Sequence, residues 1–187
     1  SAGAGLGAAL AILFFSKIYI VQLFSFLFGL LAVLMTYSLS RVYRTTPVLM
    51  LVLSGMIVGA LFSAGTSLLK YIADPVNQMP SIVFWMLGSL NNASNKDLII
   101  AGPVMLGGIV VLLLIRWRIN LLAMGEEEAR SLGVETGRIR AVIIFCATVI
   151  SASAVSISGI IGWIGLVIPH IGRILVGPDN KKLLPVV

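Results

Sequence analysis

Long runs without charge dominate this sequence and restrict the chain to a fold that lipid can surround. Residues 18–40, 45–69 and 141–172 each contain no Asp, Glu, Lys or Arg. A helix of about 20 apolar residues is long enough to cross the hydrocarbon core of a bilayer. Charged residues make up only 11% of the chain, whereas soluble domains carry about 25%. We therefore predict an integral membrane protein and exclude a soluble globular domain.

These runs predict about six membrane-spanning helices. The run 141–172 is too long for one comfortable crossing, and Gly159 and Gly162 favour a break inside it. Two further runs, 98–115 and the short, small-residue-rich 2–16, supply the other crossings. The predicted fold is an all-α polytopic transmembrane bundle with spans at 2–16, 18–40, 45–69, 98–115, 139–159 and 163–176.

The basic residues predict the orientation of the bundle, because Lys and Arg are enriched in cytoplasmic loops. With alternating spans and a cytoplasmic 116–140 loop, ten of the 13 basic residues lie inside and three outside. The inner ones are Arg41, Arg44, Arg116, Arg118, Arg130, Arg138, Arg140, Arg173, Lys181 and Lys182, and the outer ones are Lys17, Lys70 and Lys96. This distribution explains the net charge of +6 as membrane topology, and we expect no nucleic-acid partner.

Two loops carry structure of their own. In the outer loop, about 70–97, the segment 82–88 is too short to span, and Trp85 suits a helix at the membrane interface. In the inner loop, 119–138, Gly125 and Gly133 divide two short helices. Three consecutive acidic residues, Glu126 to Glu128, keep this loop in water. A compact acidic element of this kind suggests a docking site for a soluble partner.

The sequence lacks the motifs that several classes of enzyme and transporter require. It contains no Walker A motif, no dinucleotide-binding G-x-G-x-x-G after a strand and no H-E-x-x-H metal spacing. The predicted hydrocarbon centres hold no ionisable side chain, which argues against an ion-coupled transporter. An intramembrane serine protease would need a serine motif and a histidine. The segment Ser156-Ile157-Ser158-Gly159 matches that motif poorly, although His170 could supply the histidine. Packing is therefore the favoured role of these serines.

Four segments, in the right order along the whole chain, resemble the FecCD-type ABC importer permeases. Residues 121–134 are similar to the coupling segment of that family, and 159–173 are similar to its G-x-I-x-F-V-G-L-x-x-P-H-x-x-R signature, although Ile161 and Trp163 replace commoner residues. Residues 84–90 resemble its outer W-x-x-G-S-L element, and 1–7 resemble its S-x-G-A-x-x-G entry to the third helix.

The resemblance implies a ten-helix permease subunit, of which residues 1–187 would be a single transmembrane domain, a fragment without the first two and last helices. It implies a homodimer in a bacterial or archaeal cytoplasmic (inner) membrane, with cytoplasmic ABC ATPase subunits and an extracytoplasmic substrate-binding protein as partners. ATP and Mg²⁺ would bind the ATPase, so this chain would hold no cofactor or metal and would not be an enzyme. The expected cargo is an iron-siderophore, haem or cobalamin. The alternatives are an oxyanion such as molybdate, or an ATPase-independent channel or secondary transporter.

The resemblance also implies roles for particular residues. Thr45, Thr46 and Pro47 would form a cytoplasmic gate, although Pro47 equally suits the first turn of a helix. The pathway would involve Gly55 and Gly59, whose ordinary role is helix packing. Apart from the resemblance, Pro169 is expected to break or kink its helix. Pro169 and His170 then form either a structural kink, with His170 bonded to a backbone carbonyl, or a pathway hinge in a moving span. The ATPase-coupling residues would be Leu122, Met124, Gly125, Glu126, Glu127, Ala129, Arg130, Leu132 and Gly133.

Overall fold

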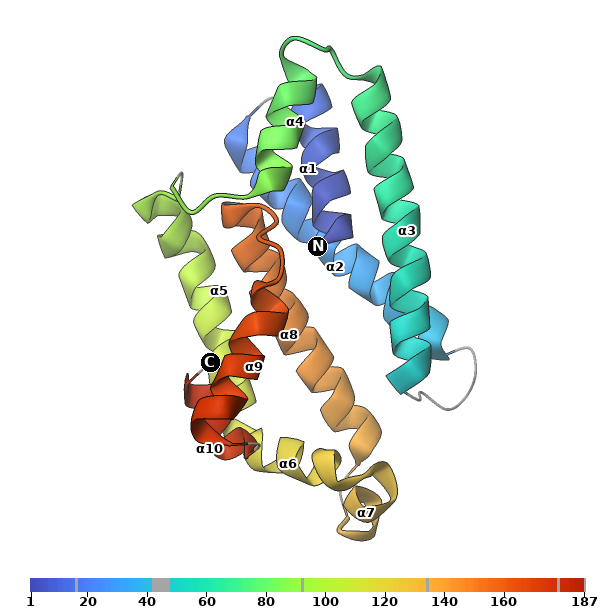
Figure 1. Cartoon of the computed structure of the whole chain (residues 1–187), viewed down its shortest axis with the longest axis vertical. Helices are drawn as coiled ribbons and strands as arrows, with labels where there is room; N and C mark the ends of the chain where they lie inside the picture. The colour runs from blue at the N-terminus through green and yellow to red at the C-terminus, as the bar shows by residue number, and fades with distance from the viewer. Residues whose placement is uncertain (16, 42–47, 92, 134, 178, 187) are drawn as a thin grey trace. The chain divides into compact units, whose positions relative to one another are not determined.

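The computed structural model contains helices and no strand within the residues it describes, which are all except 16, 42–47, 92, 134, 178 and 187 (Figure 1). For residues 41, 48, 123, 124, 126, 127, 130 and 181 it describes the backbone alone. The helices are α1 (Ala2–Phe14), α2 (Ile18–Arg41), α3 (Val48–Ile72), α4 (Gln78–Leu87), α5 (Asn95–Leu114), α6 (Arg116–Met124), α7 (Glu126–Ser131), α8 (Thr136–Ser158), α9 (Ile164–Val176) and α10 (Asn180–Val186).

Within the described part of the chain, four helical stretches are long and apolar enough to cross a membrane: Ile18–Ser40, Leu49–Ile72, Asn95–Leu122 and Thr136–Ser158. Two of the predicted spans, 2–16 and 163–176, correspond to the shorter apolar helices α1 and α9. The predicted membrane bundle is therefore confirmed, with four full-length spans and with two shorter apolar helices at the predicted spans 2–16 and 163–176. The break expected near Gly159 lies between α8 and α9, and α4 begins four residues before the predicted 82–88 helix.

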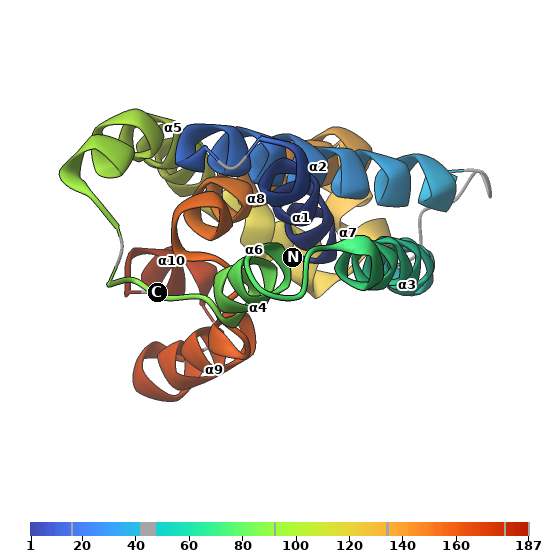
Figure 2. The same cartoon turned by 90° about the horizontal axis from the view of Figure 1, so that it is seen from above.

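The chain divides into two compact units, Ser1–Ala101 with Ser151–Ile161, and Gly102–Ile150 with Gly162–Val187. In the first unit α1 lies against α2, α3 and α4 (Figure 2). Close approach explains the glycines of α1, because a Cβ atom at Gly3 or Gly7 would collide with the carbonyl oxygens of Phe28 and Phe24 respectively. Small residues at such a crossing bring two membrane helices into backbone contact.

Apolar side chains complete the packing around α1. Ala8, Ala11 and Val21 form one buried cluster, and Trp85 of α4 packs against it. A second cluster joins α1 to the α3–α4 connection through three buried residues, Ala9, Ala73 and Ile82. The short outer helix α4 is therefore held to the bundle by its apolar side.

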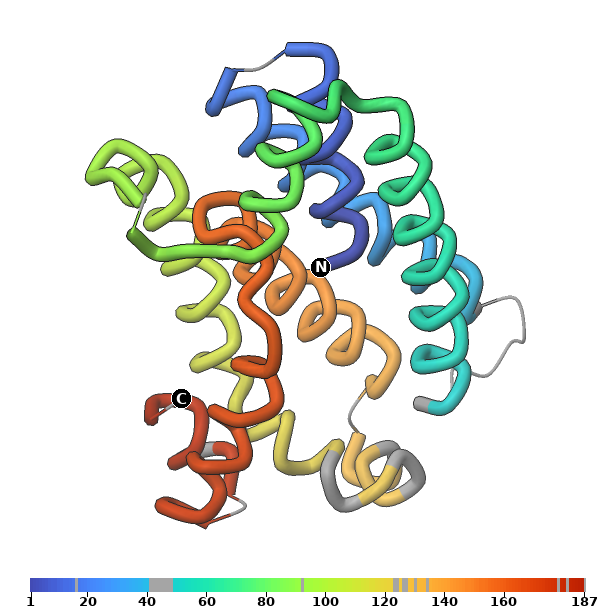
Figure 3. Tube along the Cα trace, turned by 45° about the horizontal axis from the view of Figure 1, so that its top comes forward, coloured from blue at the N-terminus to red at the C-terminus, as the bar shows by residue number. Residues whose placement is uncertain are grey.

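In the second unit the short helices gather at one end. Here α6 packs against α7 and α10, and α10 also packs against α9. Figure 3 shows the trace leaving α9 and turning into α10 beside it. In the same unit α5 approaches α8 closely, since a Cβ atom on Gly108 would lie 2.8 Å from the side chain of Ile150.

Candidate functional site

The predicted inner element consists of two helices joined by one glycine. Helix α6 ends at Met124, Gly125 has a φ of 134°, and α7 begins at Glu126. A side chain at Gly125 would be strained at that φ and would collide with the carboxylate of Glu128. The sequence therefore separates these helices at a position that only glycine fills easily.

The apolar residues of this element divide between its inside and its surface. Ala129 is completely buried, and its amide donates a hydrogen bond to the carbonyl of Gly125. Leu122 is half-buried, whereas Leu132 is 62% exposed. Gly133 follows α7 with a left-handed φ of 77°. The side chains of the remaining predicted coupling residues, Met124, Glu126, Glu127 and Arg130, lie outside what the structure describes.

A side-chain amide ties α6 to the start of α10. The Nδ2 atom of Asn120 donates a 2.6 Å hydrogen bond to Oδ1 of Asp179. The Oδ1 atom of the same amide accepts a 2.9 Å hydrogen bond from the backbone N–H of Asn180. Both polar ends of this side chain are thus engaged by two consecutive residues, through the carboxylate of Asp179 and the backbone N–H of Asn180.

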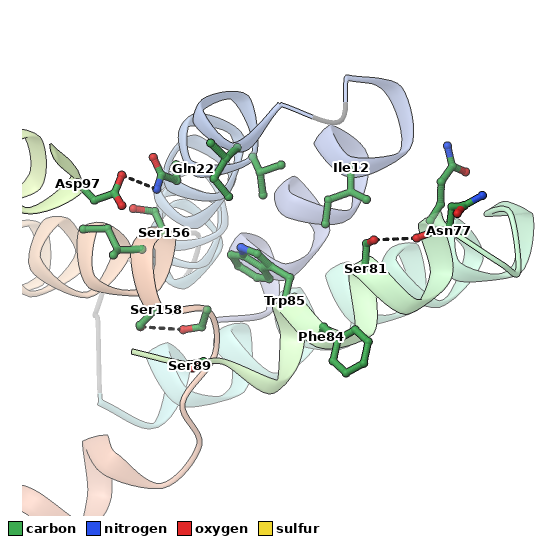
Figure 4. Close-up of a pocket in the computed structure, with 15 residues that line it drawn as sticks. Ile12, Gln22, Asn77, Ser81, Phe84, Trp85, Ser89, Asp97, Ser156 and Ser158 are labelled. Atoms are coloured by element: carbon green, nitrogen blue, oxygen red, sulfur yellow. Dashed lines mark hydrogen bonds between the residues drawn. The ribbon is translucent and has the colours of Figure 1, made fainter. Parts of the chain in front are cut away.

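The first unit contains a cavity of about 460 Å³ (Figure 4). Trp85 forms part of its wall, and polar side chains from three other helices join it, among them Gln22, Asp97 and Ser156. Gln22 donates a 2.9 Å hydrogen bond from Nε2 to Oδ1 of Asp97. The backbone N–H and the hydroxyl of Ser94 both donate to the other carboxylate oxygen, at 3.0 and 2.8 Å. One carboxylate therefore fixes the start of α5 against α2.

Two glycines allow α4 to cross the end of α8 beside this cavity. Gly88 and Gly159 have left-handed φ values of 67° and 71°. A Cβ atom on Gly159 would collide with the carbonyl oxygen of Trp85, and one on Gly88 would lie 2.7 Å from the carbonyl oxygen of Ile160. The sequence elements 84–90 and 159–173 thus meet through their glycines.

The serines considered for a protease have structural roles. The Ser156 hydroxyl donates to the carbonyl of Ser153 at 2.8 Å, and the Ser158 hydroxyl donates to the carbonyl of Ala154 at 3.0 Å. Bonds of this kind satisfy a hydroxyl inside its own helix.

Of the predicted gate and pathway residues, the structure describes Gly55 and Gly59 but not the gate. Thr45, Thr46 and Pro47 lie outside the described residues. On α3, a Cβ atom at Gly55 would make ordinary contact with Thr36 at 3.7 Å, and one at Gly59 would meet no described atom within 4 Å. This face of α3 is therefore not closely packed within the described part of the chain.

Pro169 does not break the helix, because α9 runs through it from Ile164 to Val176. The kink expected as the alternative stays a prediction. Pro169 lies beyond the first turn of α9, and its missing N–H removes the helical bond to the carbonyl of Gly165 while the rest of the helix continues. The chain leaves helical geometry earlier, where Gly159 and Trp163 both have positive φ. His170 is exposed, and it has no hydrogen-bond partner among the residues that the structure describes.

Comparison with known proteins decides the family. The profile of the FecCD transport family matches residues 1–187. The chain belongs to the FecCD transport family. Its relatives are permease components of transport systems and not enzymes, and this FecCD chain is a multi-pass membrane protein like them.

Curated relatives of this FecCD chain carry names for different cargoes. It is 40% identical over 185 residues to the molybdate import system permease protein MolB of Haemophilus influenzae, covering 99% of this chain and 55% of the relative. It is 43% identical to the "Probable iron chelatin transport system permease protein" of Helicobacter pylori, covering 98% of this chain and 55% of the relative. It is 37% identical to the cobalamin import system permease protein BtuC of Halobacterium salinarum, covering 100% of this chain and 50% of the relative.

A solved structure has the same fold. The structure described as "An inward-facing conformation of a putative metal-chelate type ABC transporter" superposes with a TM-score of 0.91 at 39% identity, covering 99% of this chain and 59% of that chain. This FecCD chain spans about half the length of the curated relatives it matches.

Sequence reasoning missed two polar clusters in this FecCD chain, Asn120 with Asp179 and Gln22 with Asp97. The partners lie 59 and 75 residues apart, so no local periodicity pairs them. The only available signal was a polar residue standing alone at the edge of an apolar run, as Gln22 does.

Proposed function

We propose that this chain forms the membrane path of a binding-protein-dependent ABC importer and is driven by a cytoplasmic ATPase. One observation carries the proposal: two short helices, α6 and α7, stand between the long helices α5 and α8 instead of a simple turn. Arg116 and Arg118 in α6 and Arg138 at the start of α8 favour a cytoplasmic position for this end.

The geometry of α6 and α7 suits a docking element. Ala129 is buried and anchors α7, while Glu128 and Ser131 are exposed and Leu132 is 62% exposed. An exposed leucine beside charged residues resembles the centre and rim of a protein interface. We infer that the coupling residues named from the sequence contact the ATPase here, with ATP and Mg²⁺ bound by that partner.

A second permease copy would complete the path. Met56, Ile57 and Leu61 of α3 are 58%, 63% and 61% exposed. The open face around Gly59 leaves room for another surface to approach. We infer that α3, with Gly55 and Gly59, faces a homodimer partner and the pathway. Thr45, Thr46 and Pro47, just before α3, would then form the cytoplasmic gate. The outer end, with α4, would receive the substrate-binding protein.

The docking proposal is tested by reversing charge on α7 in the full-length permease. The double variant Glu126→Lys/Glu127→Lys is expected to weaken ATPase binding about tenfold or more, because like charges would face the ATPase surface. Glu135→Lys is the matched control, since Glu135 lies outside the two helices in an exposed pair with Arg138 at 2.8 Å. Binding is measured by titrating purified ATPase against the permease in nanodiscs.

Two results would overturn the proposal. Normal ATPase binding by the double variant would remove α7 from the interface. Substrate uptake by the wild-type permease without any ATPase would favour a channel or secondary transporter instead.

For cargo, we propose a metal chelate of the iron-siderophore, haem or cobalamin class. The names of the iron chelatin and cobalamin relatives support it, and α3 has no charge before Lys70 with which to attract an oxyanion. The molybdate relative supports the alternative. Uptake of radiolabelled ferric siderophore, haemin, cobalamin and molybdate into the same vesicles, loaded with the cognate binding protein, separates these classes. Uptake of molybdate alone would contradict the chelate assignment.

A further inference from the structure

The amide of Asn120 joins two parts of the chain that are far apart in sequence. It donates to Asp179 at 2.6 Å and accepts from the N–H of Asn180 at 2.9 Å. The first bond has a carboxylate as acceptor, which makes it stronger than a bond between neutral groups. The second satisfies an N–H at the start of α10 that no helical carbonyl can reach.

The position of Asn120 gives these bonds a consequence. It lies in α6, which packs on α7, the helix proposed to dock the ATPase. Asp179 and Asn180 begin α10, which packs on both α6 and α9 (Figure 1). Helix α9 carries the proposed hinge residues Pro169 and His170.

The backbone offers no short route between these helices. Helix α6 continues directly from α5 through Ile115, so α5 follows any displacement of α6 by covalent connection. Helix α9 is separated from α6 along the chain by α7 and the whole of α8. Displacement of α6 therefore reaches α9 through side-chain and packing contacts, and α10 makes them on both sides.

We propose that Asn120 is the positioning residue that couples the docking helices to α9. Its two hydrogen bonds make α6 and the start of α10 move as one body, so that displacement of α6 by the ATPase also displaces α9. This inference rests on the proposed function. A rigid, discrete contact of this kind is what coupling between distant sites requires physically.

The pair can be broken and rebuilt by exchanging its groups. In Asn120→Asp two carboxylates face each other and the donor to Asp179 is lost. In the double variant Asn120→Asp/Asp179→Asn the donor and acceptor change sides, and position 120 still accepts from the N–H of Asn180. Asp179→Asn alone keeps an acceptor oxygen toward Asn120 and is the conservative control. Asn120→Leu removes both bonds without adding charge.

The experiment uses the full-length permease with its ATPase and binding protein in vesicles. It measures ATPase affinity, ATP hydrolysis and substrate molecules imported per ATP. We expect Asn120→Asp and Asn120→Leu to bind the ATPase within about twofold of wild type, but to import about fivefold less substrate per ATP or lower still. The double variant and Asp179→Asn are expected to return to near the wild-type ratio.

Different failures point to different errors. A wild-type ratio in both Asn120→Asp and Asn120→Leu would overturn the coupling role, while the proposed function would stand. Loss of ATPase binding or of thermal stability in Asn120→Leu would make Asn120 a docking or folding residue and would also overturn it. A wild-type permease that neither binds nor uses an ATPase would overturn the proposed function itself, and this inference with it.

Discussion

The amide nitrogen of Ser89 donates a 2.7 Å hydrogen bond to the carbonyl oxygen of Ser158. This bond joins the residue after the C-cap of α4 to the last residue of α8, and left-handed glycines stand beside both partners, at 88 and 159. The C-terminal end of α4 is thus held to the end of α8 through backbone atoms, and side chains are excluded at this crossing. Substitutions that add one carbon atom here test that arrangement directly.

Gly159→Ala is expected to destabilise the protein by about 1–3 kcal/mol, because alanine is strained at a φ of 71° and its Cβ would meet the Trp85 carbonyl. The measurement is the thermal unfolding midpoint of the full-length protein in detergent. Gly137→Ala is the control, since it lies in the first turn of α8 with no described atom near its added Cβ. A fall of equal size in both variants would contradict the crossing as the cause.

Gly7→Ala is expected to cost about 1–3 kcal/mol of stability, because the new methyl group would push α1 away from the backbone of Phe24. Gly5→Ala on the same helix is the matched control. Its Cβ would lie 3.4 Å from the flexible end of Ile160, an ordinary contact, so its midpoint should stay near that of wild type. Equal unfolding midpoints for the two variants would mean that α1 and α2 are not in backbone contact.

Asp97→Ala is expected to lower the stability by about 1 kcal/mol, because Gln22 and Ser94 lose the oxygen atoms to which they donate. Asp97→Asn retains an acceptor oxygen and should recover part of that loss. Chemical denaturation of the two variants in the same detergent compares them. If Asp97→Asn were the more damaging change, the charge and not the hydrogen bonds would hold this end of α5.

Ser25→Ala is expected to leave stability unchanged or to raise it by about 1 kcal/mol. The Ser25 hydroxyl is fully buried, and it has no hydrogen bond to any residue that the structure describes. Burying a hydroxyl without a partner costs free energy that alanine avoids. Ser156→Ala is the comparison, since that hydroxyl donates to the Ser153 carbonyl of its own helix and its loss should cost about 0.5–1 kcal/mol. A clear loss in Ser25→Ala would reveal a partner outside the described residues.

The long helices could be predicted because the signal for each is local. Each is an uncharged run of residues flanked by basic residues or by helix breakers such as glycine and proline. The split between α6 and α7 was equally local, since Gly125 interrupts the pattern at the point where φ becomes positive. At Pro169 the sequence predicted a break or a kink, and the structure has no break, because α9 continues through the proline with one helical bond missing. The contacts of Asn120 and Asp97 could not be predicted, because each depends on which helices lie side by side and not on neighbouring residues.

Helix α9 has 13 residues between Trp163 and Gly177, which both have positive φ. At about 1.5 Å per residue it is about 20 Å long, shorter than the hydrocarbon layer of about 30 Å. The non-helical residues 159–163 have to supply the remaining depth, and backbone polar groups there need protein or water around them. The bilayer can also adapt by thinning next to α9. The stability of the folded state should therefore depend on lipid chain length. We expect short-chain lipids, which form thinner bilayers, to favour the folded state.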